Sequence, residues 1–166
     1  MYQYFSNKSE LIQQIMLAKV EQDLEAFVQI RTLSDNAVKE ILEIAKHVIH
    51  TLRKVSPALM YDLQKYHHES WCTMNDLRKA HIYTQIKSNL ERGLAEGLYR
   101  KEIDADIISK IYVTTAMIIA GDEIFPLQEY PKYKVVEMFM NYHIHGIASP
   151  QGLALLELYS LEKGIG

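Results

Sequence analysis

The sequence predicts an all-α protein of about seven helices, and three observations support this prediction. Apolar residues recur at the spacing of amphipathic helices along most of the chain. No stretch shows the strict alternation of apolar and polar residues that is typical of a half-buried strand. Residues that favour helix starts and stops stand between the apolar stretches. A chain of 166 residues is long enough to bury a substantial core, so we expect one compact helical bundle.

The first two helices are predicted from their N-caps and apolar stripes. Asn7 and Glu10 have the spacing of a capping box, and apolar residues then share one face to about residue 30. Ser34 or Asp35 is the expected N-cap of the second helix. The stripe of that helix comprises Val38, Ile41, Leu42, Ala45, Val48, Ile49 and Leu52.

Proline and glycine mark the third and fourth helices. Ser56-Pro57 is a cap followed by proline at the first helical position, so a short helix is expected from there to about residue 66. A long fourth helix follows from about Glu69 to Leu94, and Gly93 and Gly97 mark its end. Its apolar residues are Trp71, Met74, Leu77, Ile82, Ile86 and Leu90.

The same signals predict the last three helices. Asp104 is the expected cap of a fifth helix over residues 106–120, which Gly121 ends. Pro131 opens a sixth helix that runs to about residue 145. Ser149-Pro150 repeats the cap-plus-proline signal for a short seventh helix to about Leu161.

Composition excludes several classes of protein. The net charge of −3 lacks the basic excess that is typical of a general nucleic-acid binder. Cys72 is the only cysteine, so no intrachain disulfide can form, and we expect a cytoplasmic location. No apolar run approaches the ~20 residues that a membrane-spanning helix needs, and the start of the chain has no secretory signal pattern, so no membrane partner is expected.

The fifth and sixth helices are apolar around most of their circumference, whereas a helix on a domain surface should have one polar face. Two such helices cannot both be central in a domain of this size. We therefore expect each to pack inward on one side and against a second copy on the other, as a two-fold four-helix interface. A buried hairpin within a monomer is the alternative. The expected homodimer residues are Ile108, Ile111, Thr115, Ile119, Val136, Phe139, Met140 and His143.

Three segments carry a resemblance to a known family. The first, Tyr2-Gln-Tyr-Phe-x-x-Lys-x-Glu10-Leu, is an aromatic cluster that leads through a polar turn into the first helix. The second, Gly93-Leu-Ala-Glu-Gly-Leu-Tyr-Arg-Lys-Glu-Ile-Asp104, precedes the fifth helix, and the third, Asn141-Tyr-His-Ile-His-Gly-Ile-Ala-Ser-Pro-Gln-Gly152, ends the sixth. In this order they resemble the close of the DNA-binding domain and the two ends of the dimerisation helices of TetR-family transcriptional regulators.

This resemblance implies a division of the chain. Residues 1–6 would be the remnant of a helix-turn-helix domain that is otherwise missing, and residues 7–166 the ligand-binding and dimerisation domain of a repressor. Tyr2, Tyr4 and Lys8 match family positions that touch DNA phosphates, so they are expected to do so in the full-length protein. A bound effector would tilt the first helix and so change the affinity for operator DNA.

The family also places a small-molecule pocket among the first five helices. Such pockets are mainly apolar, with a few polar groups that fix orientation, and methionine and aromatic side chains adapt to varied ligands. The same residues at helical spacing are also typical of an ordinary core. The expected ligand-binding residues are Met60, Tyr61, His67, Trp71, Cys72, Met74, Asn75, Tyr83, Tyr112 and Met117.

Other chemistry is not favoured by the sequence. The seven histidines do not occur in the Glu-x-x-His pairs of a di-iron bundle, so no metal and no other cofactor is expected. Cys72 has no triad partners, and we expect it to be a small buried residue. We therefore do not expect an enzyme. Two alternatives to a regulator stay open. One is a stand-alone helical dimer that binds a small apolar molecule and never touches DNA; the other is an enzyme on a helical bundle, which would require a tightly bound stoichiometric metal.

Overall fold

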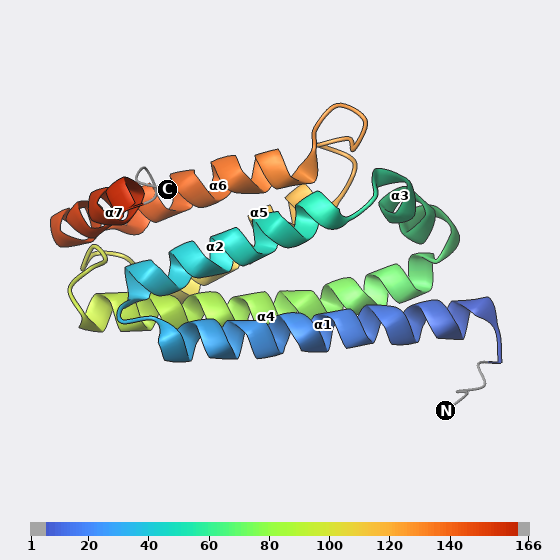
Figure 1. The fold of residues 1–166 in the computed structure, drawn as a ribbon, viewed down its shortest axis with the longest axis horizontal. Coiled ribbons are helices and arrows are strands. Elements are labelled where there is room, and N and C mark those ends of the chain that lie inside the picture. Colours follow the sequence, from blue (N-terminus) through green and yellow to red (C-terminus); the bar gives the residue numbers. More distant parts are fainter. Residues whose placement is uncertain (1–5, 163–166) are drawn as a thin grey trace.

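The computed structural model describes residues 6–162, which form seven α-helices (Figure 1). This confirms the predicted all-α class: within the described range the only β-type pairing is an isolated bridge between Tyr99 and Ala148. The helices are α1 (Lys8–Leu33), α2 (Ala37–Lys54), α3 (Pro57–Tyr66), α4 (His68–Ala95), α5 (Ala105–Ala120), α6 (Lys132–Ile147) and α7 (Pro150–Glu162). None of these helices is both long enough and apolar enough to cross a membrane.

The helix caps agree with the sequence in two places and differ in a third. Asn7 Oδ1 accepts from the backbone N–H of Glu10 at 2.9 Å, and Asp104 Oδ1 accepts from that of Ile107 at 2.9 Å, as predicted. The predicted cap of α2 was wrong, because Asn36 caps it by accepting from Lys39 N at 2.9 Å. Ser34 instead ends α1, with its hydroxyl donating to the Ile30 carbonyl at 2.6 Å.

The helices are arranged around α4. The long helices α1 and α4 lie side by side and run in the same direction, and α2 returns above them (Figure 1). α5 packs along α4, and α6 packs along α2. α3 contacts α4 at one end of the bundle, while α7 contacts α2 at the other (Figure 1).

The buried apolar side chains form two separate clusters. The larger lies among α2, α4, α5, α6 and α7 and includes Ile41, Leu90 and Ile144. The smaller lies between α1 and α4, where Met16, Val20, Trp71 and Met74 are buried against α3. A domain usually has one contiguous core, so two separate clusters leave incompletely packed space between them. Such a space can hold a small ligand.

A buried polar network links α1, α2 and α4 at the end of the bundle where α1 meets α2. Glu40 is completely buried, and its carboxylate pairs with Arg92 Nη1 at 2.9 Å and Arg31 Nη1 at 3.3 Å. Arg92 also donates to the Ser34 carbonyl at 2.8 Å and to Glu96 Oε1 at 2.8 Å. Nearly every donor and acceptor of the ion pair is thus satisfied, which is the condition for burying charge without a large penalty.

The loop after α4 is fixed to the start of α7. A side chain at position 93 would clash with the Tyr99 ring, which lies directly against Gly93. Gly97 adopts φ +71°, a conformation that favours glycine. The Tyr99 hydroxyl donates to Asn89 Oδ1 at 2.6 Å inside the core. Ser149 N in turn donates to the Leu98 carbonyl at 2.9 Å, so the segments 93–104 and 147–152, far apart in sequence, are joined.

Replacing Arg92 with alanine should destabilise the fold, because it leaves the Glu40 carboxylate buried with only the half-exposed Arg31 as a partner. We expect a loss of about 3 kcal/mol in the free energy of unfolding. Lys79→Ala, which removes an exposed pair with Asp76, is the control and should cost less than about 1 kcal/mol. Urea unfolding followed by circular dichroism measures both. Equal losses in the two variants would contradict a special role for the network.

Candidate functional site

A cavity of about 210 Å³ lies in the gap between the two clusters. It is lined by residues from all of the first six helices. Its lining residues are Val20, Asp23, Leu24, Phe27, Ile44, His47, Val48, Thr51, Leu52, Met60, Arg78, His81, Ile82, Gln85, Ile86, Tyr112, Ala116, Met117, Ile119, Ala120, Lys132, Val136 and Phe139.

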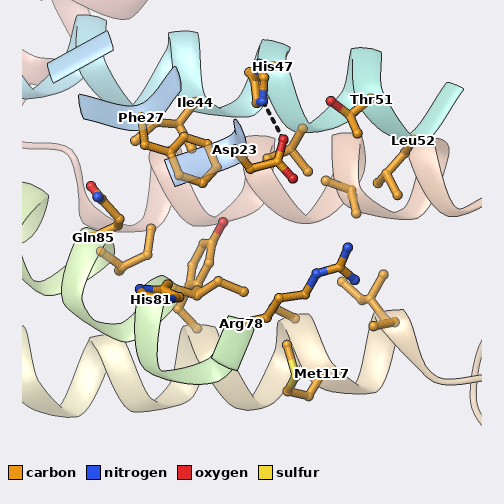
Figure 2. Close-up of a pocket in the computed structure, with 18 of the residues that line it drawn as sticks. Asp23, Phe27, Ile44, His47, Thr51, Leu52, Arg78, His81, Gln85 and Met117 are labelled. Atoms are coloured by element: carbon orange, nitrogen blue, oxygen red, sulfur yellow. Dashed lines mark hydrogen bonds and ion pairs between the residues drawn. The ribbon is translucent and has the colours of Figure 1, made fainter. Parts of the chain in front are cut away.

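The wall is mostly apolar, with a few polar side chains that come chiefly from α4 and α2. Arg78, His81 and Gln85 follow one another along α4, and His47 and Thr51 project from α2 across the cavity (Figure 2). An apolar enclosure with a small number of polar groups is the usual composition of a site for a small organic molecule. Its volume lies below the roughly 300–1,000 Å³ of drug-sized pockets, so the site fits a small ligand.

Asp23 links α1 to α2 at the cavity wall. Its Oδ1 atom lies 3.0 Å from His47 Nε2 and 2.9 Å from Lys19 Nζ. The His47 ring also packs edge-on against Phe27, with 5.5 Å between ring centroids. The charge of Asp23 is therefore already engaged by two groups outside α4, and the interaction holds α1 and α2 together beside the cavity.

Among the described residues, Arg78 on α4 and Lys132 on α6 are the arginine and lysine side chains that line the cavity. The Arg78 side chain extends away from α4 into the cavity, on the side of Leu52 (Figure 2). Burial lowers the pKa of its guanidinium, and the more distant Asp23 opposes this shift only in part. Among residues 6–162 no carboxylate pairs with Arg78 within 4.0 Å.

A second cation, Lys132, closes the cavity near the start of α6. It is only 6% exposed, and its ammonium donates to the carbonyls of Gly121 and Phe125, the latter at 2.6 Å. Burial lowers the pKa of Lys132, and Asp122 Oδ1 at 4.0 Å opposes the shift. Lys132 is therefore occupied by the α5–α6 loop and ties that loop to the start of α6.

The structure brings three of the predicted ligand-binding residues to the cavity: Met60, Tyr112 and Met117. Trp71 and Met74 are buried in the smaller cluster, beside Val20, which does line the cavity. The remaining predicted residues lie elsewhere. Tyr61 is exposed, Asn75 has a buried Oδ1 atom without a partner in the described range, the Tyr83 hydroxyl donates to Asp106, and His67 lies between α3 and α4.

The expectation that Cys72 is buried was wrong. Cys72 is exposed on α4, with its Sγ 3.5 Å from His68 Nε2 one turn earlier. The reason is the helical phase set by its buried neighbours Trp71 and Met74, which turns the intervening residue toward solvent.

The predicted dimer residues divide between the surface and the interior. Ile111 is 56% exposed, and Ile108 and Thr115 are half-buried. The other five do not face outward in the single chain: Val136 and Phe139 line the cavity, and Ile119, Met140 and His143 are buried. The exposed apolar side chains of these two helices are instead Ile107, Ile111 and Ile118 on α5 and Met138 and Tyr142 on α6.

Of the predicted phosphate contacts, Tyr2 and Tyr4 lie outside the described residues, whereas Lys8 is the exposed first residue of α1.

Sequence reasoning missed the polar cavity residues Asp23, His47, Arg78, His81 and Gln85, as well as Lys132. One signal was present. Arg78 stands at helical spacing between Met74 and Ile82, which places a charge in the inward stripe of α4.

The cavity does not have the groups of a metal centre. Within residues 6–162, no cluster of three or more histidine, cysteine, aspartate or glutamate side chains could hold a metal ion.

Comparison with known proteins finds no match of this chain to a family model, to a curated protein or to a solved structure.

His143 lies behind the cavity wall, with its ring 4.7 Å from that of Tyr112 and 6.1 Å from that of Phe139. Burial lowers its pKa from 6.5 to about 4, and its Nε2 atom has no hydrogen-bond partner in the described part of the chain. The folded protein therefore holds this histidine neutral, whereas the unfolded chain takes up a proton as the pH falls through 6.5.

The stability of the protein should consequently decrease on mild acidification. Because the folded pKa is below the unfolded one, His143 should remove about 2 kcal/mol from the free energy of unfolding between about pH 7 and about pH 5. His143→Gln should lose this part of the pH dependence, and His145→Gln, at an exposed position, should keep it. Urea unfolding at several pH values measures the effect. An identical slope in all three proteins would show that His143 does not titrate as described.

Proposed function

We propose that residues 7–166 are the effector-binding and dimerisation domain of a TetR-like transcriptional repressor. The effector is a small, largely apolar molecule that occupies the cavity between the two apolar clusters. The observation that carries the proposal is the position of this cavity: four lining residues, Val20, Asp23, Leu24 and Phe27, belong to α1. In the proposed regulator α1 is the helix that leads from the DNA-binding domain.

The proposed mechanism is a shift between two states. Two recognition helices in a dimer must lie about one DNA turn apart, ~34 Å, to enter successive major grooves. A ligand can change that spacing only if it binds one state of the dimer more tightly than the other. A molecule held against Phe27 and Leu24 would favour one position of α1 relative to α2 and α4. The Asp23–His47 contact at 3.0 Å is the link that such a movement would strain or release.

Two of the three segments that carry the family resemblance, 93–104 and 141–152, meet in space, which supports the proposal. Segment 93–104 contributes the Leu98 carbonyl and the Arg100 N–H, and these bond to Ser149 N at 2.9 Å and the Ile147 carbonyl at 2.8 Å. Gly152 is also packed directly against the Leu98 carbonyl. The two segments therefore form one structural unit that positions the start of α5 and the end of α6, the two proposed dimerisation helices.

The surface of α5 and α6 supports dimerisation. Ile107, Ile111 and Ile118 occupy one exposed side of α5, and Met138 and Tyr142 are 71% and 78% exposed on α6. We call these five residues the α5–α6 surface. Single exposed apolar residues are common, but several on each of two contacting helices support an interaction site. A second copy packed there would make a four-helix interface.

The dimer is tested with an Ile111→Glu/Tyr142→Glu variant, since two carboxylates on the α5–α6 surface would be buried without partners at the interface. The wild-type protein should be a dimer by light scattering at micromolar concentration, and the variant a monomer with unchanged helical circular dichroism. Val28→Glu, at a 60% exposed apolar position on α1, is the control and should remain dimeric. A monomeric wild type, or a dimeric double variant, would contradict the proposed interface.

A further inference from the structure

We infer that the effector is a small monocarboxylate with an apolar body, whose carboxylate binds the guanidinium of Arg78 inside the cavity. This inference rests on the proposed function, because it takes the cavity as the effector site, and it adds the chemical class of the effector. Two observations carry it: Arg78 lies in the cavity wall, and Asp23, the acidic residue of that wall, pairs with Lys19 and His47.

Arg78 occupies a position that packing alone would give to an apolar residue. On α4 it is spaced at helical intervals from Met74 and Ile82, which face inward, while the neighbouring Leu77 is 36% exposed. The chain therefore directs an arginine into an apolar space and leaves a leucine nearer to solvent. In Figure 2 the side chain of Arg78 extends into the space that the surrounding helices leave open.

The charge of Arg78 lacks a direct partner among residues 6–162. Among the described residues that line the cavity, Asp23 is the acidic one, and its Oδ1 atom pairs with Lys19 and His47, not with Arg78. An arginine does not lose its proton in a protein, so burial cannot neutralise it. Arg78 is half-buried, and a partly desolvated charge without a counter-ion is costly, so an anionic ligand would lower that cost.

The shape of the site favours a carboxylate among anions. The planar guanidinium presents paired N–H donors that match the two oxygens of a carboxylate. The other cation at the cavity, Lys132, is occupied by the Gly121 and Phe125 carbonyls, so one guanidinium is available for one negative charge. A cavity of about 210 Å³ with a mostly apolar wall then leaves room for a short hydrocarbon or aromatic body.

Three ligands of matched length test the inference: octanoate, octanol and octylamine, titrated into the full chain by calorimetry. Octanoate should bind more tightly than octanol by on the order of ten- to a hundredfold, the effect of one charge-assisted hydrogen-bonded pair. Octylamine should bind more weakly than octanol, because its ammonium would meet the guanidinium. Arg78→Met should lose the preference for octanoate, and Arg78→Lys should keep part of it.

The control is Lys79→Met, which removes the same charge from the next residue of α4, where the side chain is 51% exposed. It should leave octanoate binding unchanged. Thermal unfolding without ligand gives a second readout. Arg78→Met should raise the melting temperature, because it removes an unpaired charge from apolar surroundings, whereas an arginine that pairs with Asp23 in solution would make the same variant less stable.

The possible failures are distinguishable. Equal binding of the three ligands, or octanoate binding that survives in Arg78→Met, would overturn the carboxylate inference and leave the apolar effector cavity in place. No binding of any of them would overturn both the inference and the effector cavity. A lower melting temperature for Arg78→Met would assign the arginine a structural role and also overturn the inference. The dimer experiment with the α5–α6 surface is independent of all three results.

Discussion

The buried ion pair between Glu40 and Arg92 holds together the end of the bundle on which the rest of the architecture is built. Through Arg92 it reaches the Ser34 carbonyl at the turn between α1 and α2, and through Glu96 it reaches the first N–H of α2. Tyr99 and Asn89 bond to the Ala37 carbonyl from the other side. The α1–α2 turn, the start of α2, the end of α4 and the loop after α4 are thus fixed together at one end of the bundle.

The cavity follows from this arrangement. The helices are pinned where α1 ends and α2 begins, and the apolar residues near that end pack into the larger cluster. The smaller cluster packs α1 and α3 against the first half of α4. Between the two clusters the wall contains Arg78, His81 and Gln85, whose polar heads cannot fill an apolar core. A space of this kind lowers stability unless something occupies it, and the Arg78 charge adds to the cost.

Local patterns in the sequence predicted the helices because caps, prolines and glycines act within a few residues. The cap of α2 is the exception: Ser34, Asp35 and Asn36 are all good N-caps, but the Ser34 hydroxyl bonds back to Ile30 and the Asn36 side chain donates to Tyr159 at 2.7 Å, contacts that the sequence does not reveal. The roles of Gly93, Tyr99 and Gly152 also required the fold, because each is explained by a contact with a residue that is distant in the sequence or on another element.

The cavity could be predicted only in part, because a difference of one position on a helix turns a side chain by about 100°. The sequence analysis took Leu77 as an inward residue of α4 and therefore missed Arg78. The inward faces of α5 and α6 were also unknown, so the predicted dimer residues include Ile119, Met140 and His143, which are buried within the single chain. Met60, Tyr112 and Met117 were found because apolar and aromatic residues there do face the cavity.

Native mass spectrometry of the protein as purified is the decisive test of a dimer with an anionic effector in its cavity, because it reports assembly and bound small molecules together. We expect a dimer that carries an organic adduct, released on denaturation and detected as a negative ion. A strictly monomeric protein without an adduct at micromolar concentration would contradict this expectation.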